Sequence, residues 1–209
     1  MVNLAAPAKR AQCAVCLRPT STCICRWITP LAPRVEVLIL QHPREVGRAK
    51  GTARLLHLSL AHSRIVVGER FEPAALRALL NPTARPMQVL LLYPHTPGDL
   101  ALLAPPPYDA AGLAPPGQLR LVVLDGTWRE SRKLLQLNPA LQSLARLPLR
   151  ELPTSRYLIR KAQRAHQLST LEATCAALAQ LEGEAQAYEP LLRAFDGFVA
   201  QQSGYRLAH

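Results

Sequence analysis

Residues 119–130 read LRLVVLDGTWRE, and they decide how the rest of the chain is interpreted. The apolar run before Asp125 contains β-branched residues and predicts a buried strand. Thr127 and Glu130 have the spacing of a capping box, in which each side chain binds a backbone N–H of the other residue, so a helix is expected to begin there. The segment therefore predicts a strand, a turn and a helix whose N-terminus lies at the carboxyl edge of a sheet, where open α/β folds bind ligands.

Short apolar runs alternate with helix-like segments around this unit. Further strands are expected at residues 35–41, 64–68 and 87–93. Near-continuous apolar strands separated by helices are typical of a mostly parallel sheet with helices on both faces, so the sequence predicts an α/β fold. The proline-rich residues 94–116 are expected to form a surface loop. Helices are expected at residues 51–61, 73–80, 127–137, 169–181 and 188–202.

The charge of the chain is unevenly distributed. The 209 residues carry a net charge of +11, and basic side chains outnumber acidic ones by nine to two in residues 1–60 and by ten to three in residues 120–166. An Arg-rich composition explains the excess of Arg over Lys but not the net charge, so a polyanionic partner such as nucleic acid is favoured. No apolar run approaches the ~18 residues of a membrane helix, and no signal peptide is recognised, so a cytoplasmic protein is expected.

Four of the five cysteines lie within residues 13–25, in the spacing C-x2-C-x6-C-x-C. Four thiolates complete a tetrahedral Zn²⁺ site without an open position, so a structural zinc is predicted, with an iron–sulfur or a redox-active cluster as alternatives. Residues 1–32 are expected to form this zinc-binding unit and residues 33–209 the α/β domain. The remaining Cys175 lies in an apolar run and is expected to be buried. The predicted ligands are Cys13, Cys16, Cys23 and Cys25.

Two segments carry candidate chemistry. Asp125 at the strand end is a candidate base or orienting acceptor, and Trp128 is a candidate platform for base stacking. The alternative is that Asp125 only shapes the turn and Trp128 packs in the core. Ser169 and Glu172 form a second capping box. No G-x-G-x-x-G or Walker motif favours NAD or ATP chemistry. The cations between the two boxes suit phosphate groups or form a solvated basic face: Arg129, Arg132, Lys133, Arg156, Arg160, Lys161 and Arg164.

Taken together, these segments resemble the DTW-domain family. Residues 125–128 (DGTW) match its D-x-T-W signature, and the other matching segments occur in the expected order over roughly residues 13–180. They are the four cysteines, residues 41–45 (QHPRE), 91–94 (LLYP), 155–157 (SRY) with Arg160, and 168–173 (LSTLEA). Residues 185–209 match no segment of the family.

Bacterial members of this family are similar to tRNA-uridine aminocarboxypropyltransferases, which transfer the 3-amino-3-carboxypropyl group of S-adenosylmethionine to N3 of a tRNA uridine and form acp3U. The resemblance therefore implies this activity, with tRNA as partner. For this transfer, Asp125 at the strand end is the expected catalytic residue, and a monomer is expected. It also implies a SPOUT-like fold with a trefoil knot at the cofactor site. A SPOUT-type RNA methyltransferase and a non-catalytic zinc-ribbon RNA-binding protein are the alternatives.

Candidate ligand contacts follow from the two capping boxes and the matching segments. The candidate S-adenosylmethionine contacts are Leu92, Tyr93, Pro94, Leu124, Gly126, Thr127, Ser155, Tyr157, Ser169, Thr170 and Glu172. The candidate tRNA contacts are Trp128, Arg129, Arg156, Arg160 and Lys161.

Overall fold

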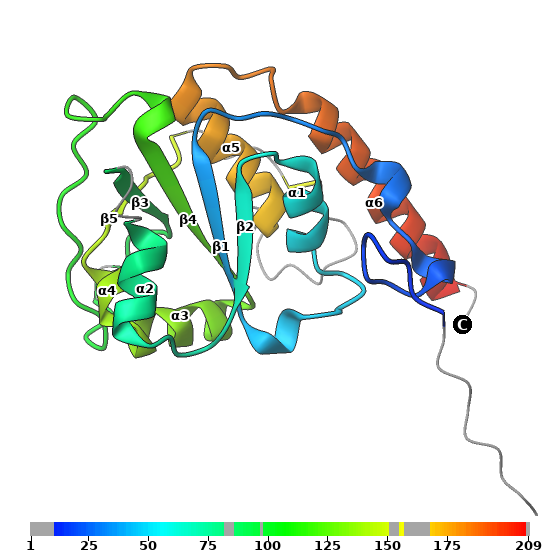
Figure 1. Cartoon of the computed structure of the whole chain (residues 1–209), viewed down its shortest axis with the longest axis horizontal. Coiled ribbons are helices and arrows are strands. Elements are labelled where there is room, and N and C mark those ends of the chain that lie inside the picture. The colour runs from blue at the N-terminus through cyan, green and yellow to red at the C-terminus, as the bar shows by residue number, and fades with distance from the viewer. Residues whose placement is uncertain (1–10, 82–85, 97, 151–154, 157–167, 208–209) are drawn as a thin grey trace, which may run out of the picture.

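A computed structural model describes residues 11–81, 86–96, 98–150, 155–156 and 168–207. These residues form a five-stranded sheet with the order β2-β1-β4-β3-β5, and every adjacent pair of strands is parallel (Figure 1). The predicted parallel α/β fold is therefore confirmed at this level. The strands are β1 (Glu36–Gln41), β2 (Ser63–Val67), β3 (Gln88–Leu92), β4 (Leu119–Asp125) and β5 (Ala145–Arg146).

Helices follow most of the strands. The five predicted helices are confirmed, with ends that differ by a few residues from the expected ranges. The α-helices are α1 (Ala53–Ser59), α2 (Pro73–Leu80), α3 (Trp128–Leu137), α4 (Pro139–Gln142), α5 (Thr170–Glu182) and α6 (Glu189–Leu207). The 3-10 helices are η1 (Thr20–Thr22), η2 (Cys25–Trp27), η3 (Pro43–Glu45) and η4 (Pro116–Gln118).

The sheet separates two apolar cores, because successive side chains of a strand point to opposite faces. On one face, Val37 and Ile39 of β1 share a core with buried side chains of α1, α5 and α6. On the other face, Leu38 and Leu40 pack in a core with side chains of α2, α3 and α4. Helices therefore cover both faces, as predicted. Cys175 belongs to the first core at 1% exposure, and burial raises the pKa of its thiol to about 12.

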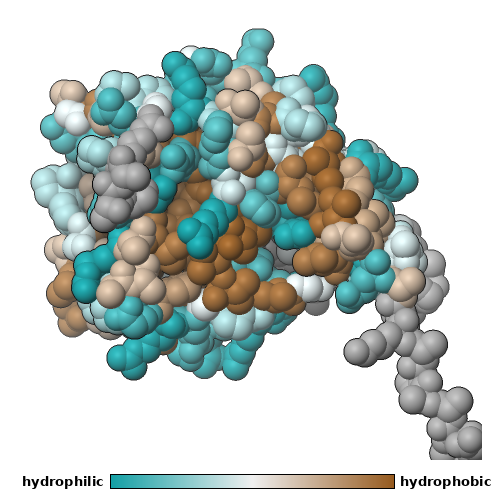
Figure 2. Space-filling model, viewed as in Figure 1, coloured by the Kyte–Doolittle hydropathy of each residue, from teal (hydrophilic) through white to brown (hydrophobic). Residues whose placement is uncertain are grey.

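The sheet ends in an edge strand, β2, which is only partly covered. Arg64 and Val67 of this strand are exposed, Val67 to 49%, and its other residues are half-buried. Figure 2 shows apolar side chains gathered over the middle of this view of the molecule, with hydrophilic side chains around them. Across the residues described, no helix has both the length and the apolar character needed to cross a membrane.

The N-terminal residues 11–32, called here the cysteine segment, pack against the C-terminal helix. Cys16 and Ile24 are buried in the same core as α5 and α6, and Figure 1 shows the segment beside α6. Trp27 Nε1 donates to Gln201 Oε1, and Gln201 Nε2 donates to the Cys23 carbonyl at 3.1 Å. The C-terminal residues of α6 thus hold the cysteine segment.

Candidate active site and cysteine centre

Both predicted capping boxes are present, and both lie at the carboxyl edge of the sheet. At the start of α3, Thr127 Oγ1 accepts from the Glu130 N–H at 3.3 Å, and the Thr127 N–H donates to Glu130 Oε2 at 2.8 Å. At the start of α5, the Ser169 N–H donates to Glu172 Oε2 at 2.7 Å, and Ser169 Oγ accepts from the Glu172 N–H at 3.2 Å. Two helix N-termini, each with a positive dipole end, therefore border the same edge.

Asp125 is held between three elements at this edge. The parallel register places Gln41 of β1 beside it, and Gln41 Nε2 donates to Asp125 Oδ2 at 2.8 Å. Thr170 Oγ1 donates to Asp125 Oδ1 at 2.7 Å from the start of α5. The residue is 4% exposed. Its carboxylate is thus fixed in orientation and joins β1, β4 and α5.

The first of two pockets beside Asp125 has a volume of about 400 Å³, within the range of small-molecule sites. Its wall is largely apolar and comes from the ends of β3 and β4, the residues after β5, and the start of α5. Seven of the predicted cofactor contacts lie in this wall. They are Leu92, Tyr93, Pro94, Leu124, Gly126, Ser169 and Thr170.

The remaining predicted cofactor contacts lie elsewhere. Thr127 lines the second pocket. Ser155 and Glu172 line neither pocket: the Ser155 hydroxyl donates to the Glu172 carboxylate, 3.1 Å from both of its oxygens. The predicted contact Tyr157 lies outside the described residues.

The second pocket, of about 390 Å³, adjoins the first. Gly126, Ser169 and Thr170 line both pockets, so the two meet at the N-termini of α3 and α5. A Cβ on Gly126 would lie 2.9 Å from the Glu130 Cβ, so no side chain fits at this junction without a shift of α3. The rest of the second wall comes from Asp125, Thr127 and residues 45 and 48–52. The arrangement can hold two small molecular groups side by side.

Glu45 is a member of this second wall that the sequence did not single out. Burial and the carboxylate of Asp125 raise the pKa of Glu45. Its neighbour Glu130 behaves differently: although burial opposes ionisation, the N–H and hydroxyl of Thr127 hold the pKa of Glu130 below its ordinary value. The one sequence signal was the position of Glu45 in the QHPRE segment, directly after a strand end at the ligand-binding edge.

Trp128 lies at the mouth of the first pocket and not in the core. It is 50% exposed, and its ring meets the edge of Tyr93 with 6.0 Å between centroids. The alternative that it is a core residue is therefore wrong. Arg129, the next residue of α3, is exposed.

Arg156 is partly neutralised by acidic side chains of α6. Its guanidinium lies 3.2 Å from Glu189 Oε1 and 3.1 Å from Asp196 Oδ2. The predicted contacts Arg160 and Lys161 lie outside the described residues.

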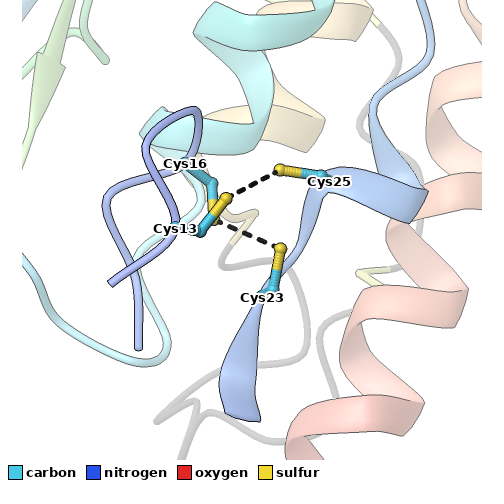
Figure 3. Close-up of side chains that lie close together, drawn as sticks. All are labelled: Cys13, Cys16, Cys23 and Cys25. Atoms are coloured by element: carbon cyan, nitrogen blue, oxygen red, sulfur yellow. Dashed lines mark hydrogen bonds between the residues drawn. The ribbon is translucent and has the colours of Figure 1, made fainter. Parts of the chain in front are cut away.

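The four predicted metal ligands converge on one point (Figure 3). Their sulfur atoms all lie within 4.8 Å of one another, with 3.5 Å between those of Cys13 and Cys25 and 3.7 Å between those of Cys16 and Cys23. A tetrahedral Zn²⁺ with Zn–S bonds of about 2.3 Å separates its ligands by about 3.8 Å. Backbone N–H groups of Cys16 and Val15 lower the pKa of Cys13 to about 6, whereas burial and the other thiols raise that of Cys25 to about 12. A divalent cation would replace the protons of these thiols, so the donor set fits a metal ion.

Arg18 connects the cysteine segment to the second pocket. The side chain is 7% exposed and donates to the carbonyl of Ala49 at 2.6 Å and to that of Gly51 at 2.8 Å. Its guanidinium also lies 5.3 Å from the centre of the Phe198 ring on α6. The cysteine segment therefore holds the loop that lines one side of this pocket.

Comparisons with known proteins agree on one family. The family model described as DTW domain matches residues 10–203. The match extends to residue 203, within α6, so the expectation that residues 185–209 match no segment of the family is wrong. A Drosophila melanogaster protein named tRNA-uridine aminocarboxypropyltransferase 2 is 34% identical over 90% of this chain and 73% of its own length. A Macaca fascicularis protein of the same name is 28% identical over 94% of this chain and 65% of its own length. An Arabidopsis thaliana protein named tRNA-uridine aminocarboxypropyltransferase A is 25% identical over 61% of this chain and 51% of its own length. No solved structure matches the chain.

Proposed function

The chain belongs to the DTW domain family, and on this basis we propose that it is a tRNA-uridine aminocarboxypropyltransferase that uses S-adenosylmethionine and forms acp3U. The observation that carries the proposal is the pair of adjoining pockets that share Gly126, Ser169 and Thr170. A transfer between two substrates requires both to be bound with their reacting atoms aligned, and two pockets with a common wall provide that arrangement.

The first pocket is proposed to hold S-adenosylmethionine, whose sulfonium makes the adjacent γ-methylene open to attack by uridine N3. Its apolar wall suits the nucleoside part of this molecule. The N-termini of α3 and α5 suit the carboxylate of the amino-acid part, because exposed N–H groups and the helix dipole favour an anion. Tyr93 and Trp128 form an aromatic pair at the same pocket and are suited to stacking on a flat ring.

The second pocket is proposed to hold the target uridine, with Asp125 as a catalytic residue in its wall. Of the two roles expected for Asp125, base or orienting acceptor, the hydrogen bonds from Gln41 and Thr170 support the orienting one, because they fix the carboxylate in one position. Arg48 and Lys50 line the same pocket and are exposed, so they are suited to the tRNA phosphates next to the uridine. Arg129 and the basic residues 156–164 are proposed to extend this tRNA surface.

The cysteine centre is proposed to bind one structural Zn²⁺ that takes no part in the transfer. Four thiolates leave no coordination position for a substrate. The sulfur separations reported above support zinc as the metal. Arg18 lies two residues after Cys16 and donates hydrogen bonds to the loop that lines the second pocket. The metal centre would then stabilise the pocket that is proposed to bind the uridine.

The proposal includes a SPOUT-related fold with a trefoil knot at the first pocket. Its support is that four separate segments of the chain, residues 92–95, 123–131, 147–149 and 168–173, contribute to this one pocket at the carboxyl edge of a parallel sheet. A monomer in the cytoplasm, where tRNA is present and thiols stay reduced, completes the proposal.

Mass spectrometry of nucleosides tests the activity. Purified protein is incubated with tRNA and S-adenosylmethionine, and the tRNA is digested to nucleosides. A uridine that has gained a 3-amino-3-carboxypropyl group is expected. A gain of a methyl group would instead favour an RNA methyltransferase, and an unchanged tRNA would favour a non-catalytic RNA-binding protein.

A further inference from the structure

The second pocket contains a carboxyl group that is better placed to receive a proton than Asp125. Glu45 ends the 3-10 helix that follows β1, and its side chain lines the pocket with 15% of its surface exposed. Asp125 is more deeply buried, and Gln41 and Thr170 each donate a hydrogen bond to one of its oxygens. A base must reach the proton that it removes, and Glu45 is the more accessible of these two carboxyl groups.

The surroundings of Glu45 favour its protonated form. Among the described residues, the charged groups that face it are Asp125 on β4, Glu130 on α3 and Arg48 in the next turn. Burial, the Asp125 carboxylate and the contact with Glu130 raise the pKa of Glu45, whereas the N–H and hydroxyl of Thr127 lower that of Glu130. Arg48 Nε lies 3.5 Å from Glu45 Oε1, but the Arg48 side chain is 53% exposed, which weakens its effect. Uridine N3 is a weak acid, so a carboxylate with a raised pKa accepts its proton more readily than an ordinary carboxylate does.

We infer that Glu45 is the general base that accepts the N3 proton of the target uridine, while Asp125 orients the base; this inference rests on the proposed function. In the step, the N3–H proton passes to the Glu45 carboxylate and the N3 electron pair forms a bond to the γ-carbon of S-adenosylmethionine. The bond between this carbon and sulfur breaks, and its electron pair leaves with sulfur, which becomes the neutral thioether of methylthioadenosine. The proton on Glu45 returns to solvent through the open pocket before the next cycle.

The test compares single-turnover transfer rates of wild-type protein, Glu45→Gln and Glu45→Asp, at saturating tRNA and S-adenosylmethionine, from mildly acidic to mildly alkaline pH. The wild-type rate is expected to rise with pH as Glu45 loses its proton and then to level off. Glu45→Gln should be slower by roughly 10²–10⁴-fold, as for other lost general bases, and should lack the rise with pH. Glu45→Asp should keep the rise at a lower rate. Glu184→Gln, a change at an exposed residue outside both pockets, is the matched control and should behave as wild type.

Thermal unfolding gives a readout that is independent of activity. Because the pKa of Glu45 is raised in the folded protein, its contribution to stability is present at low pH and is lost as pH rises through that pKa. Glu45→Gln should therefore have a higher unfolding midpoint than wild type at alkaline pH, with a smaller difference at acidic pH. A Glu45→Gln protein that transfers at the wild-type rate with the wild-type pH profile would overturn the inference and leave the proposed function intact. A wild-type protein that transfers no aminocarboxypropyl group would overturn both.

Discussion

Replacement of Arg18 by Ala tests whether the cysteine segment shapes the active site. The change removes a long hydrogen bond from a charged donor to the carbonyl of Arg48, at 3.4 Å, and two short ones to the carbonyls of Ala49 and Gly51, at 2.6 and 2.8 Å. Such bonds contribute about 1.5–3 kcal/mol each, and the lower value applies because the surrounding loop is exposed and its carbonyls regain water. Loss of the contact with Phe198 adds about 0.5–1 kcal/mol. We expect Arg18→Ala to lower the free energy of unfolding by about 3–4 kcal/mol, or the unfolding midpoint by roughly 10 °C at this chain length.

The functional effect of Arg18→Ala should be confined to the second pocket. Because residues 48–51 line that pocket and not the first, the KM for tRNA should rise while the Kd for S-adenosylmethionine stays close to that of wild type. Arg18→Lys keeps the charge but loses the forked geometry of the guanidinium. Its free energy of unfolding and its KM for tRNA should lie between those of wild type and Arg18→Ala. Arg26→Ala removes an exposed arginine of the same segment and should change the free energy of unfolding by less than about 1 kcal/mol. Wild-type stability and tRNA KM in Arg18→Ala, or an equal loss of affinity for both substrates, would refute this reasoning.

Three further changes test other parts of the account. Metal analysis should find about one zinc per chain, as four-thiolate coordination requires. Removal of the metal by a chelator should weaken tRNA binding before it weakens S-adenosylmethionine binding. Protein with intact thiols but no bound metal would contradict the proposed zinc site. Asp125→Asn should fold and bind S-adenosylmethionine but transfer roughly 10²-fold more slowly, because the group that orients the uridine is altered. Near-normal single-turnover transfer would leave Asp125 as a turn residue. Gly197→Ala places a Cβ 2.2 Å from the Trp27 ring and should destabilise the protein by about 1–3 kcal/mol. Gly204→Ala, whose Cβ would have no atom within 4 Å, should instead stabilise it by about 0.5–1 kcal/mol. Equal effects of the two changes would show that α6 does not pack tightly against Trp27.

Much of the sheet was predictable because its strands are short, strongly apolar and separated by helices. The four long strands and both capping boxes depend on local patterns, which the sequence displays directly. Among the strands and α-helices of the described residues, two were missed: β5 has two residues and α4 has four, so neither is long enough to show a period. The 3-10 helices η1–η4, of three residues each, were missed for the same reason. The packing of α6 against Trp27 joins residues more than 170 positions apart and leaves no local pattern.

The candidate site was predictable in part. The cofactor contacts were expected from the two capping boxes and from segments that resemble the DTW-domain family, and seven of them line one pocket. The second pocket was not foreseen, because its loop of residues 48–51 has no helical or strand pattern and is held by Arg18 from a distant part of the chain. Glu45 escaped notice for the same reason: its significance comes from its neighbours Asp125 and Glu130, which are far away in sequence.

The central claim, that the aminocarboxypropyl group and not the methyl group is transferred to tRNA, is tested most directly with S-adenosylmethionine that carries different isotopic labels in its carboxyl and methyl carbons. Wild-type protein and tRNA are incubated with this donor, and both labels are counted in the recovered tRNA and in the small-molecule fraction. We expect the carboxyl label to enter tRNA and the methyl label to stay in solution as methylthioadenosine. A methyl label in tRNA without the carboxyl label would contradict this claim.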